Sequence, residues 1–141
     1  MTTGACLCGE VRFEVDGPFE PLRLCHCPTC RRVTGSAFSA NARVADENFR
    51  LVAGAEHIRE WSHRLGGGYA FCGRCGSPLY ATNPARPGTR NLRLGLLDGD
   101  PGLRASAHVH VDLKAEWFEI SSSLPQFGGS APKPGDPSDP G

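Results

Sequence analysis

The sequence lacks an excess of charge of either sign. Fifteen lysine and arginine residues balance fifteen aspartate and glutamate residues, so the formal net charge at pH 7 is zero. A balanced chain has no general attraction to phosphate backbones or to anionic membrane surfaces. We therefore expect neither nucleic acid nor a membrane as a partner.

Long apolar runs are also missing. No stretch of about 18 apolar residues occurs that could form a membrane-spanning helix. The segment Met1 to Cys6 contains neither the charged part nor the apolar run of a signal peptide. These absences predict a cytoplasmic protein.

Helix signals are scarce as well. Only residues 28–35 could form a helical turn, which would begin near Pro28 and stop at Gly35. Several other segments alternate apolar and polar residues with the period of a strand that has one buried face. They are residues 11–15, 49–52, 58–62, 69–72, 92–96 and 107–111. The pattern predicts a mainly β protein of mostly antiparallel sheets, with little helix.

Length and composition predict one domain and a tail. A chain of 141 residues is long enough for one ordinary domain and too short for two. We place the domain at residues 1–125. Residues 126–141 are rich in glycine, proline and serine, a composition that buries too little apolar surface to offset the cost of ordering. We expect this part to be a flexible tail.

The cysteines number seven, which intramolecular disulfides cannot use up. A reducing compartment would not favour disulfides either, so metal ligation is the leading interpretation. A Cys-x-x-Cys pair at a tight turn lets two thiolates approach one zinc ion at about 2.3 Å. Cys72 and Cys75 have this spacing, with a redox-active dithiol as the alternative.

Cys6 and Cys8 can complete the same site. Residues i and i+2 of a strand point to one face, so this pair could supply the other two ligands if its strand lies beside Cys72. Four thiolates would form a closed, structural zinc site.

The remaining cysteines, Cys25, Cys27 and Cys30, fall at a predicted strand end and the turn after it. Three protein ligands leave one zinc position open, which is the usual arrangement of a catalytic zinc. We therefore predict two zinc ions per chain, one structural and one catalytic. Buried, unreactive thiols are the alternative for this group.

Other conspicuous side chains are expected to lie outside the ligand sets. Strand alternation points His26 away from a metal held by its two cysteine neighbours. His108 and His110 are interpreted as surface residues of a half-exposed strand. Large aromatic residues at alternating positions are usually packing residues, and we assign four to the core: Phe13, Trp61, Phe71 and Trp117.

Four stretches carry a resemblance to a known family: residues 4–13, 25–32, 71–79 and 114–117. In this combination and order they resemble the glutathione-dependent formaldehyde-activating enzyme family, which includes the domain found in centromere protein V. The resemblance covers about residues 4 to 125. It implies a β-tent fold, with sheets packed around the metal sites, and the same division of the cysteines between two zinc ions.

The resemblance also implies an activity. In the family, glutathione adds through its thiolate to formaldehyde and gives S-hydroxymethylglutathione, formally a carbon–sulfur lyase reaction run in reverse. Cys25, Cys27 and Cys30 take the catalytic-metal role by position. The sequence thus predicts a zinc-dependent carbon–sulfur lyase-like enzyme acting on a small thiol adduct, with glutathione as its small-molecule partner.

Two other functions stay open at this point. The first is a non-catalytic, zinc-stabilised protein-binding module, which would need an exposed interaction patch. The second is a methionine sulfoxide reductase, which would need a cysteine free to attack its substrate.

Overall fold

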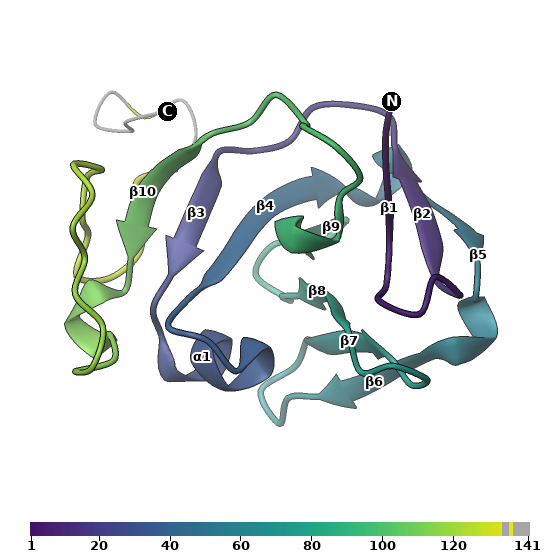
Figure 1. Cartoon of the computed structure of the whole chain (residues 1–141), viewed down its shortest axis with the longest axis horizontal. Helices are drawn as coiled ribbons and strands as arrows, with labels where there is room; N and C mark the ends of the chain where they lie inside the picture. The colour runs from purple at the N-terminus through teal and green to yellow at the C-terminus, as the bar shows by residue number, and fades with distance from the viewer. Residues whose placement is uncertain (134–135, 137–141) are drawn as a thin grey trace. The chain divides into compact units, whose positions relative to one another are not determined.

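A computed structural model describes residues 1–133 and residue 136 (Figure 1). The chain divides into two compact units, and each unit contains two separate stretches of sequence. The first unit comprises Met1–Phe19 and Ala42–Gly102, and the second comprises Glu20–Asn41 and Leu103–Gly141. The described residues form ten strands and one α-helix, which confirms the mainly β prediction.

The first unit holds one complete three-stranded sheet. Its order is β1-β2-β5, and both pairs are antiparallel. The strands are β1 (Thr2–Ala5), β2 (Arg12–Val15) and β5 (Phe49–Ala53). In β2, Phe13 and Val15 are buried while Arg12 is exposed, as the period-two pattern predicts.

A second group of strands in the first unit has the order β9-β8-β7-β6 (Figure 1). These pairs are also antiparallel. The strands are β6 (Ile58–Ser62), β7 (Gly68–Cys72), β8 (Pro78–Thr82) and β9 (Thr89–Arg93). Strand β4 (Ser39–Ala45) is the other neighbour of β9 in the strand order. Its first three residues belong to the second unit, and residues 42–45 belong to the first.

Two apolar clusters form the core of the first unit. One contains Phe13, Val15, Val44 and Leu92. The other contains Cys6, Val11, Ala70, Cys72 and Leu79. Two of the predicted metal ligands therefore lie inside a hydrophobic cluster, so that ligand placement and core packing in this unit are linked.

The second unit contains β3 (Leu22–Cys25), α1 (Pro28–Thr34), the start of β4 and β10 (Ala105–Val109). The pairing of β3 with β4 is antiparallel. The pairing of β3 with β10 is parallel, an exception to the mostly antiparallel sheets that the sequence predicts. The helix agrees with the prediction for residues 28–35: a proline stands in its first turn, and Gly35 ends it in the left-handed conformation, with φ of 63°.

Short 3-10 helices shift two predicted strand ends. The segments predicted at 92–96 and 107–111 leave strand geometry at Arg93 and Val109, because 3-10 helices follow at Leu94–Leu96 and Val111–Leu113. His110 precedes the second of these with φ of 54°, the one positive value among the described non-glycine residues.

Part of the predicted tail contacts β10. Phe127 N donates to His108 O at 2.9 Å, and the backbone N of His110, the residue after β10, donates to Gly129 O at 2.8 Å. The domain boundary at residue 125 remains a prediction. Of the tail, residues 134–135 and 137–141 lie outside the described residues.

The core assignment of the tryptophans is wrong. Trp61 is 55% exposed and Trp117 is 74% exposed, whereas Phe13 is buried and Phe71 half-buried. Trp61 belongs to β6, the last strand of its sheet order, where it lies opposite Tyr69. Trp117 follows the last 3-10 helix in a turn. Neither position has the second packing layer that a core residue needs.

The one α-helix among the described residues is seven residues long, and no helix there has the length and apolar character needed to cross a membrane.

Candidate metal centres

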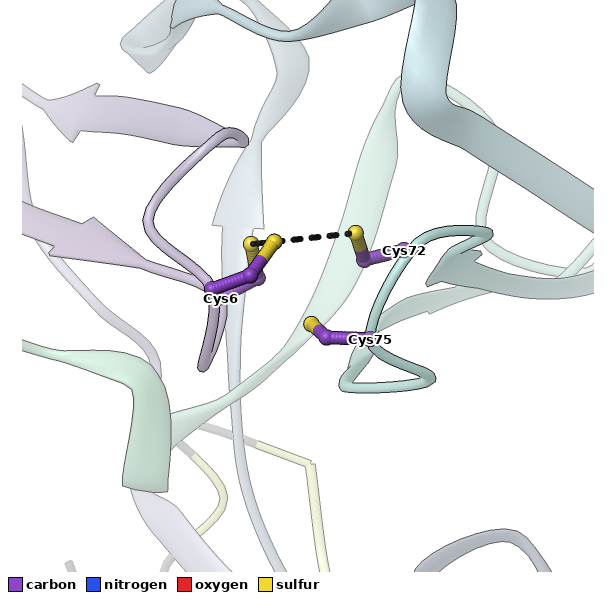
Figure 2. Close-up of side chains that lie close together, drawn as sticks. Cys6, Cys72 and Cys75 are labelled. Atoms are coloured by element: carbon purple, nitrogen blue, oxygen red, sulfur yellow. Dashed lines mark hydrogen bonds between the residues drawn. The ribbon is translucent and has the colours of Figure 1, made fainter.

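Cys6, Cys8, Cys72 and Cys75 come together in the first unit. Their four sulfur atoms all lie within 4.8 Å of one another. The sulfur–sulfur distance is 3.5 Å between Cys6 and Cys8 and 3.9 Å between Cys8 and Cys72. A tetrahedron with metal–sulfur bonds of about 2.3 Å has edges of about 3.8 Å. In Figure 2 the sulfur atoms of Cys6, Cys72 and Cys75 turn toward a common space. The group could hold a metal ion.

The turn after β7 positions two of these sulfur atoms. Cys72 ends the strand, and Gly76 N donates to Cys72 O at 2.7 Å, which closes the turn around Cys75. Gly76 has φ of 80°, a conformation that side chains with a Cβ rarely adopt. The Cys-x-x-Cys prediction for this turn thus has a direct backbone cause.

Cys6 and Cys8 reach the site by a different route from the one expected. β1 ends at Ala5, and Gly9 N donates to Cys6 O at 3.0 Å, so the two cysteines stand in a turn and not on one face of a strand. The strand explanation is therefore wrong, although the two sulfur atoms do meet.

Hydrogen bonds favour the thiolate form at two of these positions. The hydroxyl of Ser77, 3.3 Å from the sulfur of Cys75, and the Ser77 backbone N–H lower the pKa of Cys75 to about 5. Val11 N donates to the sulfur of Cys6 at 3.3 Å. Burial raises the pKa of Cys6, but this bond and the neighbouring thiols outweigh burial and lower it. Metal ligation requires thiolates, so these bonds prepare the group for an ion.

Cys25, Cys27 and Cys30 form the second group, here called the cysteine triplet. Cys25 ends β3, Cys27 caps the N-terminus of α1, and Cys30 lies within the helix. Their sulfur atoms also lie within 4.8 Å of one another, and the described residues add no fourth histidine, aspartate or glutamate ligand to them. The triplet could hold a metal ion with a coordination position to spare.

One sulfur atom of the triplet is the preferred thiolate. Hydrogen bonds from the Cys25 and Cys30 thiols lower the pKa of Cys27 to about 2, and Cys30 N donates to the Cys27 sulfur at 3.3 Å. The same contacts with Cys27 and Cys30 raise the pKa of Cys25. The triplet therefore shares its protons unevenly, with the negative charge on Cys27.

His26 lies outside the triplet, as expected, but His108 is not a surface residue. His108 is 4% exposed and His26 is fully buried. His26 Nε2 lies 2.7 Å from His108 Nδ1, and His108 Nε2 lies 3.0 Å from Ser122 Oγ. The rings of Phe38 and Phe118 lie 5.3 and 6.0 Å from the ring of His26.

This histidine pair is neutral because of its surroundings. Burial lowers the pKa of both histidines, and for His26 the charge of a protonated His108 and the charges of Lys114 and Arg31 lower it further. Sequence reasoning missed the pair and missed Ser77. For the pair no local pattern could reveal the contact, since His108 joins His26 only through the parallel pairing of β10 with β3.

Comparison with known proteins identifies the family of this chain. Residues 1–113 match the family described as glutathione-dependent formaldehyde-activating enzyme. A Halomonas elongata protein provisionally named as such an enzyme is 32% identical, and the match covers 86% of this chain and 82% of that protein. An uncharacterized lyase of Schizosaccharomyces pombe is 23% identical, with 88% of each chain covered.

A solved structure agrees. The crystal structure of a Rhodobacter sphaeroides protein superposes with a TM-score of 0.60 at 28% identity, and the match covers 71% of this chain and 92% of that one. Since the family match covers most of the sequence, the chain belongs to the glutathione-dependent formaldehyde-activating enzyme family and is an enzyme of that type.

Proposed function

We propose that this chain is a zinc-dependent carbon–sulfur lyase that joins glutathione and formaldehyde into S-hydroxymethylglutathione and catalyses the reverse reaction. The observation that supports it is the cysteine triplet: three convergent sulfur atoms, with no fourth protein ligand among the described residues, in a chain of this family. The names of the Halomonas and fission-yeast relatives agree with the substrates and with the reaction class.

Both cysteine groups suit zinc. Four thiolates from Cys6, Cys8, Cys72 and Cys75 would close a structural site, and Cys25, Cys27 and Cys30 would hold a second ion with one free position. Zinc at the triplet would supply a positive charge that favours the deprotonated form of an incoming thiol at neutral pH. A reducing compartment such as the cytoplasm would keep all seven thiols available.

The reaction itself needs little from the protein beyond placement. The thiol sulfur bonds to the carbonyl carbon of formaldehyde, the carbonyl π bond breaks, and the proton lost by the thiol ends on the oxygen. Holding the two reactants side by side removes much of the entropic cost of their encounter. The end of β3 and the start of α1 fix where the thiol can stand, since they carry Cys25 and Cys27.

The test uses exchange spectroscopy, because the two substrates also combine without a catalyst. With carbon-13 formaldehyde and glutathione at equilibrium, the zinc-loaded protein should speed the exchange between hydrated formaldehyde and the adduct. Cys27→Ser should abolish the acceleration and remove one of two zinc ions measured by native mass spectrometry. Thr29→Ala, an exposed change between the ligands, is the matched control and should leave both readouts unchanged.

One observation favours a second candidate, the zinc-stabilised binding module. Leu113 and Trp117 of the second unit are 52% and 74% exposed. If the zinc-loaded protein left the exchange rate unchanged, this alternative would replace the lyase. A methionine sulfoxide reductase is not favoured, because all seven cysteines fall in the two groups and none is left as a separate attacking thiol.

A further inference from the structure

Arg31 directly follows the last cysteine of the triplet in α1. Its backbone N donates to Cys27 O at 3.0 Å, so the helix ties its position to the ligands. The side chain is half-buried, and Nη2 donates to Leu113 O at 3.2 Å. Nε is buried and has no hydrogen-bond partner. A guanidinium has five N–H donors, and a buried charged donor without an acceptor is costly.

No described carboxylate lies within 4.0 Å of the Arg31 guanidinium, in contrast to Arg50 and Arg90, which pair with Glu14 and Asp46. An unpaired, partly buried cation beside a proposed substrate site indicates an anionic ligand.

Lys114 adds a second positive charge in the same place. Its ammonium group donates to two carbonyl oxygens, Ala115 O at 3.3 Å and Phe118 O at 2.8 Å. Carbonyl groups hold the ammonium without cancelling its charge. Lys114 directly follows Leu113, whose carbonyl oxygen accepts the hydrogen bond from Arg31, so the two cations come from neighbouring positions.

The guanidinium of arginine favours a carboxylate as the anionic ligand. Its planar fork matches a carboxylate with two parallel hydrogen bonds, whereas a lysine acts as a point charge. A peptide thiol carries carboxylates on the same small molecule as its sulfur, and glutathione has two. We propose that Arg31 binds a carboxylate of the thiol substrate while the sulfur stands at the triplet. This inference rests on the proposed function, because it takes the triplet as the place of the thiol.

The first measurement is binding without chemistry. S-Methylglutathione keeps both carboxylates but cannot form a thiolate, and its dimethyl ester lacks the carboxylates. Isothermal titration of the zinc-loaded protein should show S-methylglutathione binding at least 10-fold more tightly than the ester, since a hydrogen-bonded ion pair contributes about 10-fold or more. Equal binding of the two compounds, or no binding of S-methylglutathione, would overturn the proposal.

Variants then assign the effect to Arg31. Arg31→Gln should weaken S-methylglutathione by about 10-fold and leave the ester unchanged, with two zinc ions retained. The affinity of Arg31→Lys for S-methylglutathione should lie between those of the wild type and Arg31→Gln, because lysine keeps the positive charge and lacks the planar guanidinium that binds a carboxylate with two hydrogen bonds. Arg32→Gln removes the same charge at the exposed neighbouring position and should change neither affinity more than twofold. An equal loss for acid and ester in Arg31→Gln would assign Arg31 a structural role and reject the inference.

Failure of the proposed function can be told apart from failure of this inference. If formaldehyde exchange is not accelerated but Arg31 still discriminates the acid from the ester, the reaction is wrong and the carboxylate site stands. If exchange is accelerated and Arg31→Gln binds S-methylglutathione as the wild type does, the reaction stands and the carboxylate site is wrong.

Discussion

Among single residues, His26 and His108 join two chain segments by one hydrogen bond inside an aromatic enclosure. The contact measures 2.7 Å, and both rings are almost fully removed from water. Each neutral ring has one N–H, so the His26–His108 bond and the His108–Ser122 contact can use one donor each. The pair therefore joins β10 to the residue that follows β3, and adds a side-chain contact to the backbone pairing of the two strands.

Breaking this pair should destabilise the protein. His108→Phe keeps a ring of similar size but leaves His26 Nε2 buried and unpaired, so the free energy of unfolding should fall by about 1–3 kcal/mol. The double variant His26→Phe with His108→Phe removes both polar partners and should recover part of that loss. Urea unfolding of the zinc-loaded proteins measures this, with half-exposed His63→Phe as control. A double variant less stable than His108→Phe would contradict the account.

The same pair predicts a pH dependence. Burial lowers the pKa of both histidines below 6.5 in the folded state, so below pH 6.5 the unfolded chain binds protons that the folded chain does not. Their contribution to stability is complete above pH 6.5 and is lost as the pH falls toward the lowered folded pKa. Each histidine adds a slope of up to about 1.4 kcal/mol per pH unit. Unfolding measured from pH 7.5 to 5.5 should show a shallower slope in the double variant; identical slopes would refute it.

At the scale of elements, the turn between β7 and β8 decides whether the four-cysteine group can form. Gly76 has φ of 80°, and a Cβ built there meets no atom within 4 Å. Gly76→Ala therefore tests backbone strain alone, and should lower the free energy of unfolding by about 1–2 kcal/mol. Gly95→Ala, which also meets no atom and lacks a positive φ, should cost less than Gly76→Ala. Equal effects in urea unfolding would show that the turn conformation does not matter.

The features that the sequence predicted correctly are those set by local patterns within one element or turn. Cys72 and Cys75 are close together in the sequence, and so are Cys25, Cys27 and Cys30, so their spacing alone predicts which sulfur atoms meet. The sulfur atoms of each set do converge. The helix limits follow from Pro28 and Gly35 for the same local reason.

What the sequence could not reveal depends on pairing between distant strands. His108 becomes buried because β10 pairs in parallel with β3, more than 80 residues away, and no local period encodes that choice. Trp61 is exposed because β6 ends its strand order, while its alternation looks like that of an inner strand. Local pattern reports which residues alternate, and strand order decides which of them are covered.

For the whole molecule, the two cysteine groups belong to different units. Removing a ligand from one group should therefore destabilise a different part of the chain than removing a ligand from the other. Cys72 is fully buried in a core cluster of the first unit. If the proposed zinc ions are bound, Cys72→Ser should lose one of them and raise amide exchange across residues 1–19 and 42–102, because a structural zinc ion would contribute about 10 kcal/mol or more to folding.

Cys27→Ser is the counterpart. It should lose the other zinc ion and raise exchange within residues 20–41 and 103–133, with the first unit still protected. Hydrogen exchange read by mass spectrometry, together with zinc stoichiometry, separates the two results. If either substitution released both ions and exposed both units, the metal centres would be a single cooperative system.

The split of each unit into two stretches of sequence has a consequence for synthesis on the ribosome. The triplet is complete once Cys30 has emerged, but the four-cysteine group must wait for Cys75, about 2–9 s later at ordinary translation speeds. The segment that carries His108, Lys114 and Trp117 emerges later still. During that interval the nascent chain presents three bare thiols to whichever soft metal reaches them first, and copper binds such donors more tightly than zinc. Any metal ion bound by the triplet at this stage would therefore reflect the ions present around the ribosome before the rest of the second unit has been made.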